Sequence, residues 1–499
     1  MVDSWATSPS GAGQPDPSGP RRPAAARATV GGVDLHLDLE AGRGLRASLM
    51  RALRAAVRNG RLSPGTRLPS SRALAADLGI ARNTVADAYA ELVAEGWLTA
   101  RQGSGTRVAR RAEPPGRPVP GPRREPAGRH RATARPRHDL RSGRPDTSAF
   151  PRAAWLTSAR RALSTAPHSA FGYADPLGRP ELRRALADYL ARSRGVRADP
   201  DRILIGAGFV DALDTLARVL HGGVAVEAYG LWFHRDILTR AGLSVPPLPL
   251  DAHGTRVAAL AEAGPRAVLL TPAHQYPTGV PLHPDRRAAV VDWARGRDGL
   301  VLEDDYDGEF RYDRRPVGAV QGLDPDRVLY LGTASKSLAP ALRLGWTVLP
   351  DSLVDPVLAV RAERHHGALD QLTLADFLER GAYDRHVRAM RQRYRRRRDR
   401  LVATLAERLP QLRVTGLAAG LHAVLELPPG SEQRVVHAAT RRGLAVEGLS
   451  RFRHPGAAPG PMDRDALVVG YGAPPEHAWP STLDALCTTL TEELGRPGG

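Results

Sequence analysis

The stretch Gly332-Thr-Ala-Ser-Lys-Ser-Leu-Ala-Pro-Ala-Leu-Arg-Leu-Gly-Trp346 contains Lys336, the only lysine among the 499 residues of the chain. All other basic residues are arginines, whose guanidinium stays protonated, whereas a lysine amine can lose its proton and form a Schiff base with an aldehyde. The hydroxyls of Thr333 and Ser335 precede the lysine, and Arg343 follows it. These are groups that bind phosphate. The stretch therefore predicts a Schiff-base lysine beside a phosphate site; the alternative is an exposed lysine without a function.

Short apolar runs alternate with helical patterns on both sides of this stretch, from Asp139 onward. Such alternation is typical of a mainly parallel sheet with helices on both faces, and these folds bind ligands at the carboxyl ends of their strands. After about residue 355 the pattern becomes helical and then α+β, which predicts a smaller second lobe. The runs that predict strands are 203–205, 224–226, 267–270, 300–302, 328–331 and 346–349.

The residue types near Lys336 fit the cofactor pyridoxal 5′-phosphate (PLP), which needs an amine, a carboxylate for its ring nitrogen, an aromatic cover and a phosphate cradle. Asp304 ends a predicted buried strand and can hold the ring nitrogen, while Tyr306 can reach the ring oxygen. Each residue alone has another explanation, because Asp304 could end a strand at the surface and Arg343 could be one solvated arginine. We expect PLP, held by Lys336, Asp304, Tyr306, Thr333, Ser335 and Arg343, and no metal, since Cys487 is the single cysteine.

Residues 38–109 carry a separate pattern. Leu45, Leu49, Leu53 and Val57 recur at helical spacing, Ser70 can cap a second short helix that Gly79 ends, and a third helix is expected from Arg82 to Glu95. A β-hairpin around a Gly-Ser-Gly turn follows within residues 96–108. This order predicts an α+β winged helix-turn-helix domain over residues 38–109; a three-helix protein-interaction module is the alternative.

The net charge of +18 and the pI of about 10.9 indicate a polyanionic partner, which here is a double-stranded DNA operator. In a winged helix-turn-helix domain the start of the third helix meets base edges in the major groove. We therefore expect base contacts from Arg82, Asn83 and Thr84, and phosphate or wing contacts from Arg72, Arg101, Gln102 and Gly103.

The composition sets the expected boundaries. Residues 1–37 are predicted to form a disordered tail, and residues 110–138, rich in proline and arginine, an extended linker. Residues 139–495 form the predicted ligand-binding domain, with a large part over about 160–355 and a small lobe over about 356–495. Neither a signal peptide nor a membrane-spanning stretch is recognisable, so we expect a cytoplasmic protein without a membrane partner.

Two families resemble this chain. Residues 62–108, through LPSSRALAADLGIARNTVADAYAELVAEGWL and RQGSGTRV, resemble the DNA-binding domain of GntR-type regulators, and residues 140–475 resemble a fold-type I aminotransferase. The whole chain resembles the MocR subfamily, which joins the two. The resemblance implies that Lys336 forms the Schiff base and that the other PLP contacts are those named above. It also implies that Tyr173, in FGYADPLGRPELRRALADYL, binds the phosphate of a partner subunit, hence a head-to-tail homodimer.

The chain departs from the aminotransferase pattern at four places. Gly206-Ala-Gly-Phe-Val-Asp211 lacks the usual side-chain donors, so the backbone at Gly208 and Phe209 is expected to bind phosphate. The aromatic cover is either Trp232, shifted by one place, or missing. Tyr276 replaces an asparagine, and no arginine stands near Val468, where enzymes bind the substrate carboxylate; Arg464 is the nearest candidate.

These features predict a DNA-binding transcriptional regulator whose aminotransferase-like domain senses PLP, or an amine or amino-acid effector, rather than an enzyme. The alternative is an active PLP-dependent aminotransferase with a fused DNA-binding domain, because the Lys336, Asp304 and Tyr306 set is complete. A third reading is a scaffold without PLP that serves only dimerisation.

Overall fold

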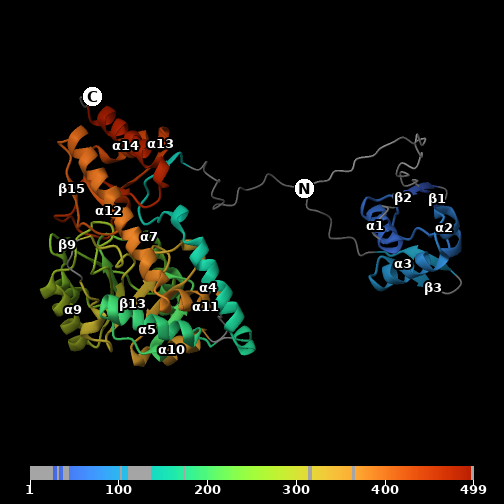
Figure 1. Ribbon diagram of the computed structural model, residues 1–499, viewed down its shortest axis with the longest axis horizontal. Coiled ribbons are helices and arrows are strands. Elements are labelled where there is room, and N and C mark those ends of the chain that lie inside the picture. Colours follow the sequence, from blue (N-terminus) through green and yellow to red (C-terminus); the bar gives the residue numbers. More distant parts are fainter. Residues whose placement is uncertain are drawn as a thin grey trace, which may run out of the picture. The chain divides into compact units, whose positions relative to one another are not determined.

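The structure is a computed structural model, and it describes residues 26–30, 33–37, 44–101, 104–110, 136–173, 175–312, 317–361 and 366–495 (Figure 1). The chain divides into two compact units, Met1–Arg131 and Ala132–Gly499. Each unit has its own hydrophobic core and is described by itself.

The first unit is a three-helix domain with a β-hairpin (Figure 1). The Oγ of Ser70 accepts a hydrogen bond from the backbone N–H of Ala73 at 3.1 Å, and Gly79 ends the second helix in the left-handed conformation. Leu49, Val85 and Leu92 lie in its buried core. The elements are α1 (Leu45–Arg58), α2 (Ser71–Leu78), α3 (Arg82–Ala94), β3 (Leu98–Arg101) and β4 (Gly105–Val108). The predicted winged helix-turn-helix architecture is confirmed.

The same unit contains a second hairpin that the sequence did not predict. β1 (Ala26–Val30) pairs antiparallel with β2 (Val33–Leu37). The prediction of a disordered tail up to residue 37 is therefore wrong for these ten residues, because backbone pairing satisfies their polar groups although their composition favours a coil. Residues 1–25 of the predicted tail and residues 111–135 of the predicted linker lie outside the described residues.

The second unit is built on a seven-stranded sheet. Every neighbouring pair of strands is parallel except the two made by β14, which runs antiparallel to both of its neighbours. In spatial order the strands are β6 (Ile203–Gly206), β14 (Gly345–Val348), β13 (Val328–Thr333), β12 (Leu300–Asp304), β11 (Ala267–Leu270), β7 (Val224–Glu227) and β8 (Pro247–Leu248). This confirms the predicted mainly parallel sheet of a fold-type I domain.

Helices cover both faces of this sheet, as continuous apolar strands require. Successive strand residues point to opposite faces, so Leu302 packs in one core cluster and its neighbour Val301 in another. The cluster of Leu302 includes α6 (Phe209–Val219), α7 (Trp232–Arg240) and α10 (Asp351–Arg361). Against the opposite face pack α5 (Pro180–Arg194), α9 (Pro284–Arg297) and α11 (Ala368–Glu379).

The smaller lobe contains a four-stranded antiparallel sheet and receives the first residues after the predicted linker. β5 (His138–Asp139) pairs with β17 (Leu444–Ala445), so the segment that leads to residue 146 belongs to this lobe. The sheet consists of β15 (Val414–Thr415), β16 (His422–Glu426), β19 (Ala466–Gly470) and β18 (Glu447–Gly448). It packs with α12 (Ala382–Arg408), α13 (Glu432–Arg441) and α14 (Trp479–Leu494).

The boundary between the two lobes lies later than predicted. Leu374 and Phe377 of α11, and Tyr383 at the start of α12, belong to the core of the large part. The predicted limit near residue 356 is too early because α11 is apolar on more than one face and packs against both α5 and α4 (Arg152–Thr165). The long helix α12 joins the lobes, since its later residues Tyr394 and Leu401 lie in the core of the small lobe.

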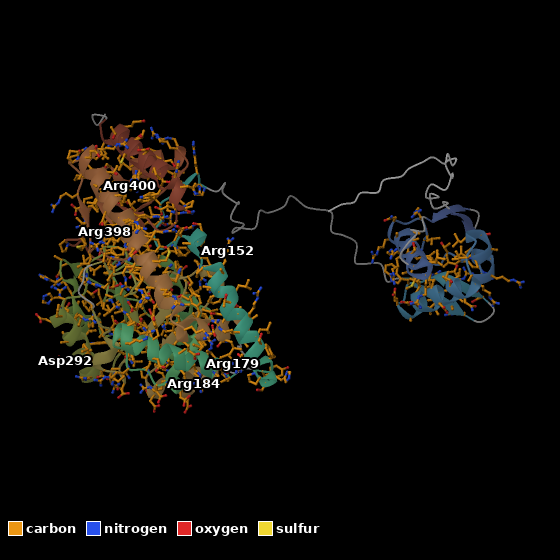
Figure 2. All side chains as sticks on the ribbon, viewed as in Figure 1. Arg152, Arg179, Arg184, Asp292, Arg398 and Arg400 are labelled. Carbon is orange, nitrogen blue, oxygen red and sulfur yellow. The ribbon has the colours of Figure 1, made fainter. Side chains whose placement is uncertain are left out.

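The basic run on α12 has a partly structural role. Arg397 is buried, and its Nη2 lies 3.0 Å from the Oδ2 of Asp146, whereas Arg400 on the same helix is exposed (Figure 2). The arginines of this basic run are therefore not all exposed to solvent. Within the described ranges, no helix is both long and apolar enough to cross a membrane.

Candidate functional site

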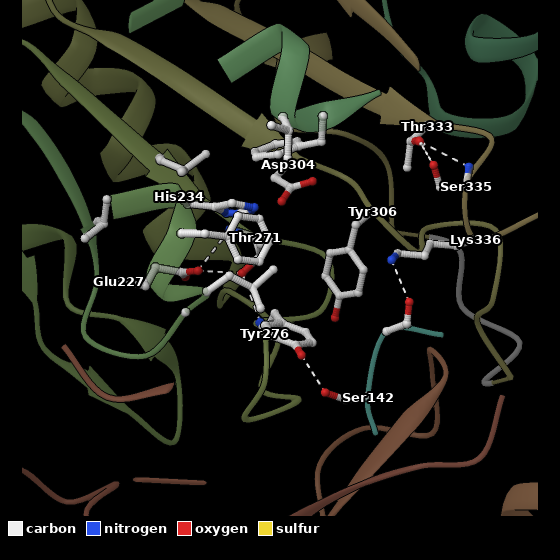
Figure 3. A pocket seen from close by; sticks show the side chains of 18 of the residues that line it. Ser142, Glu227, His234, Thr271, Tyr276, Asp304, Tyr306, Thr333, Ser335 and Lys336 are labelled. Carbon is white, nitrogen blue, oxygen red and sulfur yellow. Dashed lines mark hydrogen bonds between the residues drawn. The ribbon is translucent and has the colours of Figure 1, made fainter. Parts of the chain in front are cut away.

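A cavity of about 380 Å³ opens at the carboxyl ends of the parallel strands, where the fold predicts a ligand (Figure 3). Glu227, Asp304 and Thr333 end β7, β12 and β13 and all line it. Lys336, Tyr306, Ser335 and Arg343 line the same cavity. The structure therefore brings together residues that the sequence selected from two separate segments.

Lys336 lies three residues after β13 and points into the cavity (Figure 3). Its Nζ donates a hydrogen bond to the carbonyl oxygen of Gly143 at 2.6 Å. Gly143 has a φ of +69°, and a Cβ at this position would lie 3.6 Å from Nζ, so the backbone approaches the amine closely. Burial lowers the pKa of Lys336, with Asp304 opposing the shift, so the amine loses its proton more readily than an exposed lysine.

Asp304 presents a carboxylate to the cavity from the end of β12. Its side chain is buried, and no hydrogen bond to it occurs among the residues that the structure describes. Burial raises the pKa of Asp304 well above its usual range; the charge of Asp305 adds to this, and Lys336 opposes it. A cationic group from a ligand would therefore restore the charged form of this carboxylate.

Tyr306 stands between Lys336 and Tyr276 in the cavity (Figure 3). Its hydroxyl lies 3.0 Å from the Nδ1 of His274, which in turn lies 2.8 Å from the Oδ2 of Asp307. His274 and Asp307 were not predicted as site residues, although His274 follows β11 and Asp307 follows β12 at the same sheet edge. Tyr276 reaches Ser142, with 2.5 Å between the two hydroxyl oxygens.

Ser335, Arg343 and the start of α6 form one corner of the site. A Cβ on Gly208 would lie 3.8 Å from the Nη1 of Arg343 and 4.0 Å from the Oγ of Ser335, so the glycine leaves space between them. Gly208, with a φ of 93°, precedes Phe209, the first residue of α6, where unpaired backbone N–H groups favour an anion. Thr333 donates to Ser335, at 2.9 Å between the hydroxyl oxygens, and so orients it. Arg343 itself has a φ of +51°, a conformation of the kind that concentrates at functional sites.

The aromatic residues that line the cavity differ from the predicted one. Trp232 is 48% exposed and does not line the cavity, whereas Phe233 and His234 do. The expectation for Trp232 is corrected for a geometric reason: α7 begins at Trp232, and the helical turn directs the next two residues inward. The rings of His234 and Phe209 are 4.5 Å apart and 32° from parallel. Burial, aided by the charges of Lys336 and Arg235, lowers the pKa of His234 to about 3, so the imidazole is neutral.

Tyr173 and Arg464, which were also candidate ligand contacts, do not line the cavity of the single chain. Tyr173 is 100% exposed. Val468 is buried on β19 in an apolar cluster with Tyr276 and Phe452, so an apolar contact stands where the enzymes have an arginine. Arg464, the nearest candidate, has its Nε 3.2 Å from the Oε1 of Glu426 and does not line the cavity.

The first unit exposes its predicted DNA contacts at the start of α3. Arg82 and Asn83 are exposed there and Thr84 is half-buried, while Arg72 on α2 and Arg101 on β3 are exposed as well. Val85 and Tyr89, on the next turns of the same helix, are buried in the core. The helix therefore presents its polar start and packs its apolar side. Gln102 and Gly103, predicted for the wing, lie outside the described residues.

Two arginines that were not predicted as site residues also lie at the cavity. Arg144 and Arg235 both line the cavity, one just before the large part and one on α7. With seventy arginines in the chain, neither stood out by residue type.

Comparison with known proteins agrees with this division of the chain. Residues 45–108 match the family described as bacterial regulatory proteins, gntR family, and residues 138–458 match aminotransferase class I and II. The kynurenine aminotransferase of Pyrococcus horikoshii has a similar solved structure, with a TM-score of 0.64 and 26% identity over 72% of this chain and 92% of that one.

Two bacterial regulators match this chain over almost the full length of their own sequences. The chain is 35% identical to the probable rhizopine catabolism regulatory protein MocR of Rhizobium meliloti, over 88% of this chain and 92% of that protein. It is 34% identical to the pyridoxine biosynthesis transcriptional regulator PdxR of Corynebacterium glutamicum, over 85% and 91%. The chain therefore belongs to the MocR subfamily of GntR-type transcriptional regulators, in which a winged helix-turn-helix domain is joined to an aminotransferase-like domain.

Proposed function

We propose that this regulator binds PLP as a Schiff base on Lys336 and that PLP, or an amine or amino-acid effector, controls its affinity for a DNA operator. One observation carries the proposal: the only lysine of the chain opens onto the cavity that Asp304, Tyr306 and Arg343 also line. The regulators named for rhizopine catabolism and pyridoxine biosynthesis support control by an amine or by the vitamin itself.

The residues present fit PLP in three respects. Asp304 is a buried carboxylate facing the cavity without a hydrogen bond from the described residues, which suits a protonated ring nitrogen. The space that a Cβ on Gly208 would fill, between Arg343 and Ser335, suits a phosphate at the start of α6. The imidazole of His234 and the ring of Phe209 offer an aromatic wall in place of Trp232.

When bound, PLP supplies an aldehyde for amines and a ring that accepts electrons. The residues of this chain bind the cofactor and position its reactive groups. Lys336 provides the amine at a lowered pKa, and Asp304 holds a proton on the ring nitrogen. Tyr306, whose hydroxyl is 3.0 Å from His274, is positioned by that histidine and its partner Asp307. Arg343 and Ser335 bind the phosphate.

We further propose a head-to-tail homodimer. Leu156 and Leu163 lie seven residues apart on one side of α4 and are exposed, and Phe171 is exposed shortly after the helix. An exposed apolar surface of this kind typically marks an interface. Tyr173, fully exposed in one chain, would then approach the phosphate of the partner's site. Because a ligand can shift two states only through different affinities for them, an effector would act by favouring one arrangement of the two DNA-binding domains.

The first experiment is an absorbance spectrum of the purified protein and of Lys336→Ala, before and after borohydride, with DNA binding measured on the same samples. We expect a Schiff-base band that is absent in the variant and that borohydride abolishes in the wild type, because reduction turns the imine into a stable secondary amine that keeps the cofactor attached to Lys336. We also expect an operator affinity that changes on PLP addition. A protein that stays colourless after incubation with PLP, yet dimerises and binds DNA, would instead be the scaffold without PLP.

A second function, an active aminotransferase, is favoured by the complete set of Lys336, Asp304 and Tyr306. The apolar surroundings of Val468 argue against complete transamination, because no guanidinium stands there to bind the α-carboxylate of an amino-acid substrate. Measuring pyridoxamine phosphate after incubation with single amino acids tests this function. Stoichiometric product without turnover would indicate a half-reaction only.

A further inference from the structure

The helix α6 carries an acidic residue, Asp211, in its first turn, at the helix end that we assign to phosphate. Gly208 precedes the helix and Phe209 begins it, so Asp211 is its third residue. A carboxylate in the first turn of a helix commonly accepts hydrogen bonds from the free N–H groups there, and its charge repels a second anion. The position of this carboxylate therefore decides whether the start of α6 can bind phosphate.

The carboxylate of Asp211 does not occupy the N–H groups of the first turn. Its Oδ2 accepts a hydrogen bond from the backbone N–H of Ala207 at 2.9 Å, one residue before Gly208. The N–H of Asp211 itself donates to the carbonyl oxygen of Gly208 at 3.1 Å. Over the described part of the chain, the N–H groups of residues 208–210 have no acceptor, and two of these three residues line the cavity. The start of the helix thus keeps its donors for a ligand.

Arg361, the last residue of α10, holds the carboxylate in this position. Its Nη1 lies 3.0 Å from the Oδ2 of Asp211 and 3.2 Å from the Oγ1 of Thr215, one turn further along α6. The side chain of Arg361 is 0% exposed and that of Asp211 is 16% exposed, and neither lines the cavity. Burial opposes the charge of Asp211, but His366, the N–H of Ala207 and Arg361 hold the pKa of this carboxyl well below its usual range. The carboxylate is therefore charged, and Arg361 compensates that charge.

Two glycines give this arrangement its space. A Cβ on Gly206, the last residue of β6, would lie 2.7 Å from the Oδ2 of Asp211. A Cβ on Gly345, the first residue of β14, would lie 2.7 Å from the Cα of Gly208. Gly206 and Gly345 are paired in the sheet. Two neighbouring strands therefore carry glycine where any side chain would displace the carboxylate or the backbone beside it.

We infer that Arg361 is a positioning residue for the cofactor phosphate: it keeps the carboxylate of Asp211 on Ala207 and off the N–H groups of residues 208–210, which then bind the anion. The inference rests on the proposed PLP site and adds to it two residues that lie outside the cavity. The pair matters in this chain because the segment 206–211 lacks the usual side-chain donors, so its backbone has to bind the phosphate.

A pair with only a structural role would behave symmetrically. Removing either partner of a buried pair leaves the other charge uncompensated, so Arg361→Gln and Asp211→Asn would both lower the stability and weaken all ligands alike. The positioning role predicts an asymmetry instead. Arg361→Gln releases a carboxylate that can occupy the N–H groups and repel phosphate, whereas Asp211→Asn removes that charge.

The test uses the full-length apo-protein and follows the Schiff-base absorbance during titration with PLP and with pyridoxal, which lacks the phosphate. The ratio of the two dissociation constants measures the preference for phosphate and cancels any general loss at Lys336. The variants are Arg361→Gln, Asp211→Asn and the double variant, each with a thermal unfolding curve. Arg397→Gln is the matched control, because Arg397 is also a buried arginine 3.0 Å from an aspartate, Asp146, but does not line the cavity.

We expect the wild type to bind PLP about a hundredfold more tightly than pyridoxal, and Arg361→Gln to lose about tenfold of this preference, as hydrogen bonds to a charged group allow. Asp211→Asn and Arg397→Gln should keep the preference, and the double variant should regain most of it. If Arg361→Gln does not fold, Arg361→Lys takes its place, with a loss of about threefold because an ammonium lacks the planar fork of a guanidinium. That loss should also be reversed by Asp211→Asn.

Three results would overturn the positioning role while PLP binding stands: an unchanged preference in the Arg361 variant, an equal loss in Asp211→Asn, or no recovery in the double variant. A wild type that forms no Schiff base with PLP would overturn the proposed function, and this inference with it.

Discussion

Lys336 and Gly143 meet across 193 residues of sequence, with the Nζ of the lysine 2.6 Å from the carbonyl oxygen of the glycine. Gly143 follows β5, which pairs with the small lobe, while Lys336 follows β13, an inner strand of the large sheet. The amine proposed to bind PLP therefore contacts the first described segment after the linker. A Schiff base on this amine would therefore break its hydrogen bond to Gly143.

Adding a methyl group at Gly208 should weaken PLP binding. In Gly208→Ala the new Cβ would occupy the space between Arg343 and Ser335 that we assign to phosphate. The positive φ adds a strain on the order of 1–3 kcal/mol, so a thermal unfolding curve must accompany the measurement. Spectral titration of the apo-protein with PLP should give a dissociation constant raised at least tenfold.

Gly242→Ala provides the control for this strain. Gly242 also has a positive φ, +85°, but a Cβ there would meet nothing within 4 Å. The control should lose stability and keep its PLP affinity. If both variants bound PLP like the wild type, the phosphate would not lie at the start of α6.

Much of this architecture follows from local sequence signals. Ser70 and Gly79 mark the ends of α2 because a side-chain cap and a left-handed glycine act within a few residues. The buried strands of the large sheet are apolar on both faces. Because neighbouring parallel strands end at the same edge of the sheet, residues at their carboxyl ends lie close together in any loop conformation. Asp304 and Lys336 could therefore be placed together from the sequence.

Other parts of the site depend on contacts that no local pattern records. Trp232 and His234 are two residues apart, and only the start of α7 decides which of them enters the cavity. Arg144 reaches the site because β5 pairs with β17, more than 300 residues later in the chain. The core of the large part extends into α12 for the same reason, since Tyr383 finds its partners only after the chain has folded back.

The neutral state of His234 makes the stability of the protein depend on pH. Its pKa is about 3 in the folded protein and 6.5 ordinarily, so the unfolded chain binds the extra proton between these values. Stability is therefore fully present above pH 6.5 and falls as the pH drops toward about 3, by up to about 1.4 kcal/mol per pH unit. In His234→Phe this contribution to the slope should vanish, as measured by denaturant unfolding across this range.

His422 also has a pKa lowered to about 3 by burial, so part of the slope will remain in His234→Phe. A wild-type slope retained in full by His234→Phe would mean that this imidazole takes up its proton without opposition in the folded state.

The buried pair of Arg397 and Asp146 should contribute strongly to the stability of the small lobe. Both side chains are almost fully buried, with 3.0 Å between Nη2 and Oδ2, so Arg397→Met would leave Asp146 with less compensation in the core. Removing one partner of a buried pair costs about 3–5 kcal/mol. On the same helix, Arg408 pairs with Asp484 at 2.8 Å at the surface, where Arg408→Met should cost at most about 1 kcal/mol. Chemical denaturation of both variants gives the comparison, and equal losses would contradict the assigned role of burial.

Base contacts and phosphate contacts in the first unit can be separated by two arginine substitutions. Arg82 is exposed at the start of α3, the position that meets base edges in this fold, whereas Arg101 lies on the wing strand β3. Arg82→Ala should cost about 1–3 kcal/mol on the operator and relax its base preference. Arg101→Ala should instead weaken binding to all sequences and reduce the slope of log affinity against log salt by about 1.

Arg46→Ala on α1, where Arg46 lies 3.7 Å from Glu91, serves as the control and should alter neither quantity. Salt titrations on operator and scrambled DNA measure both effects, and a sequence-independent loss in Arg82→Ala would move that residue from base contact to phosphate contact.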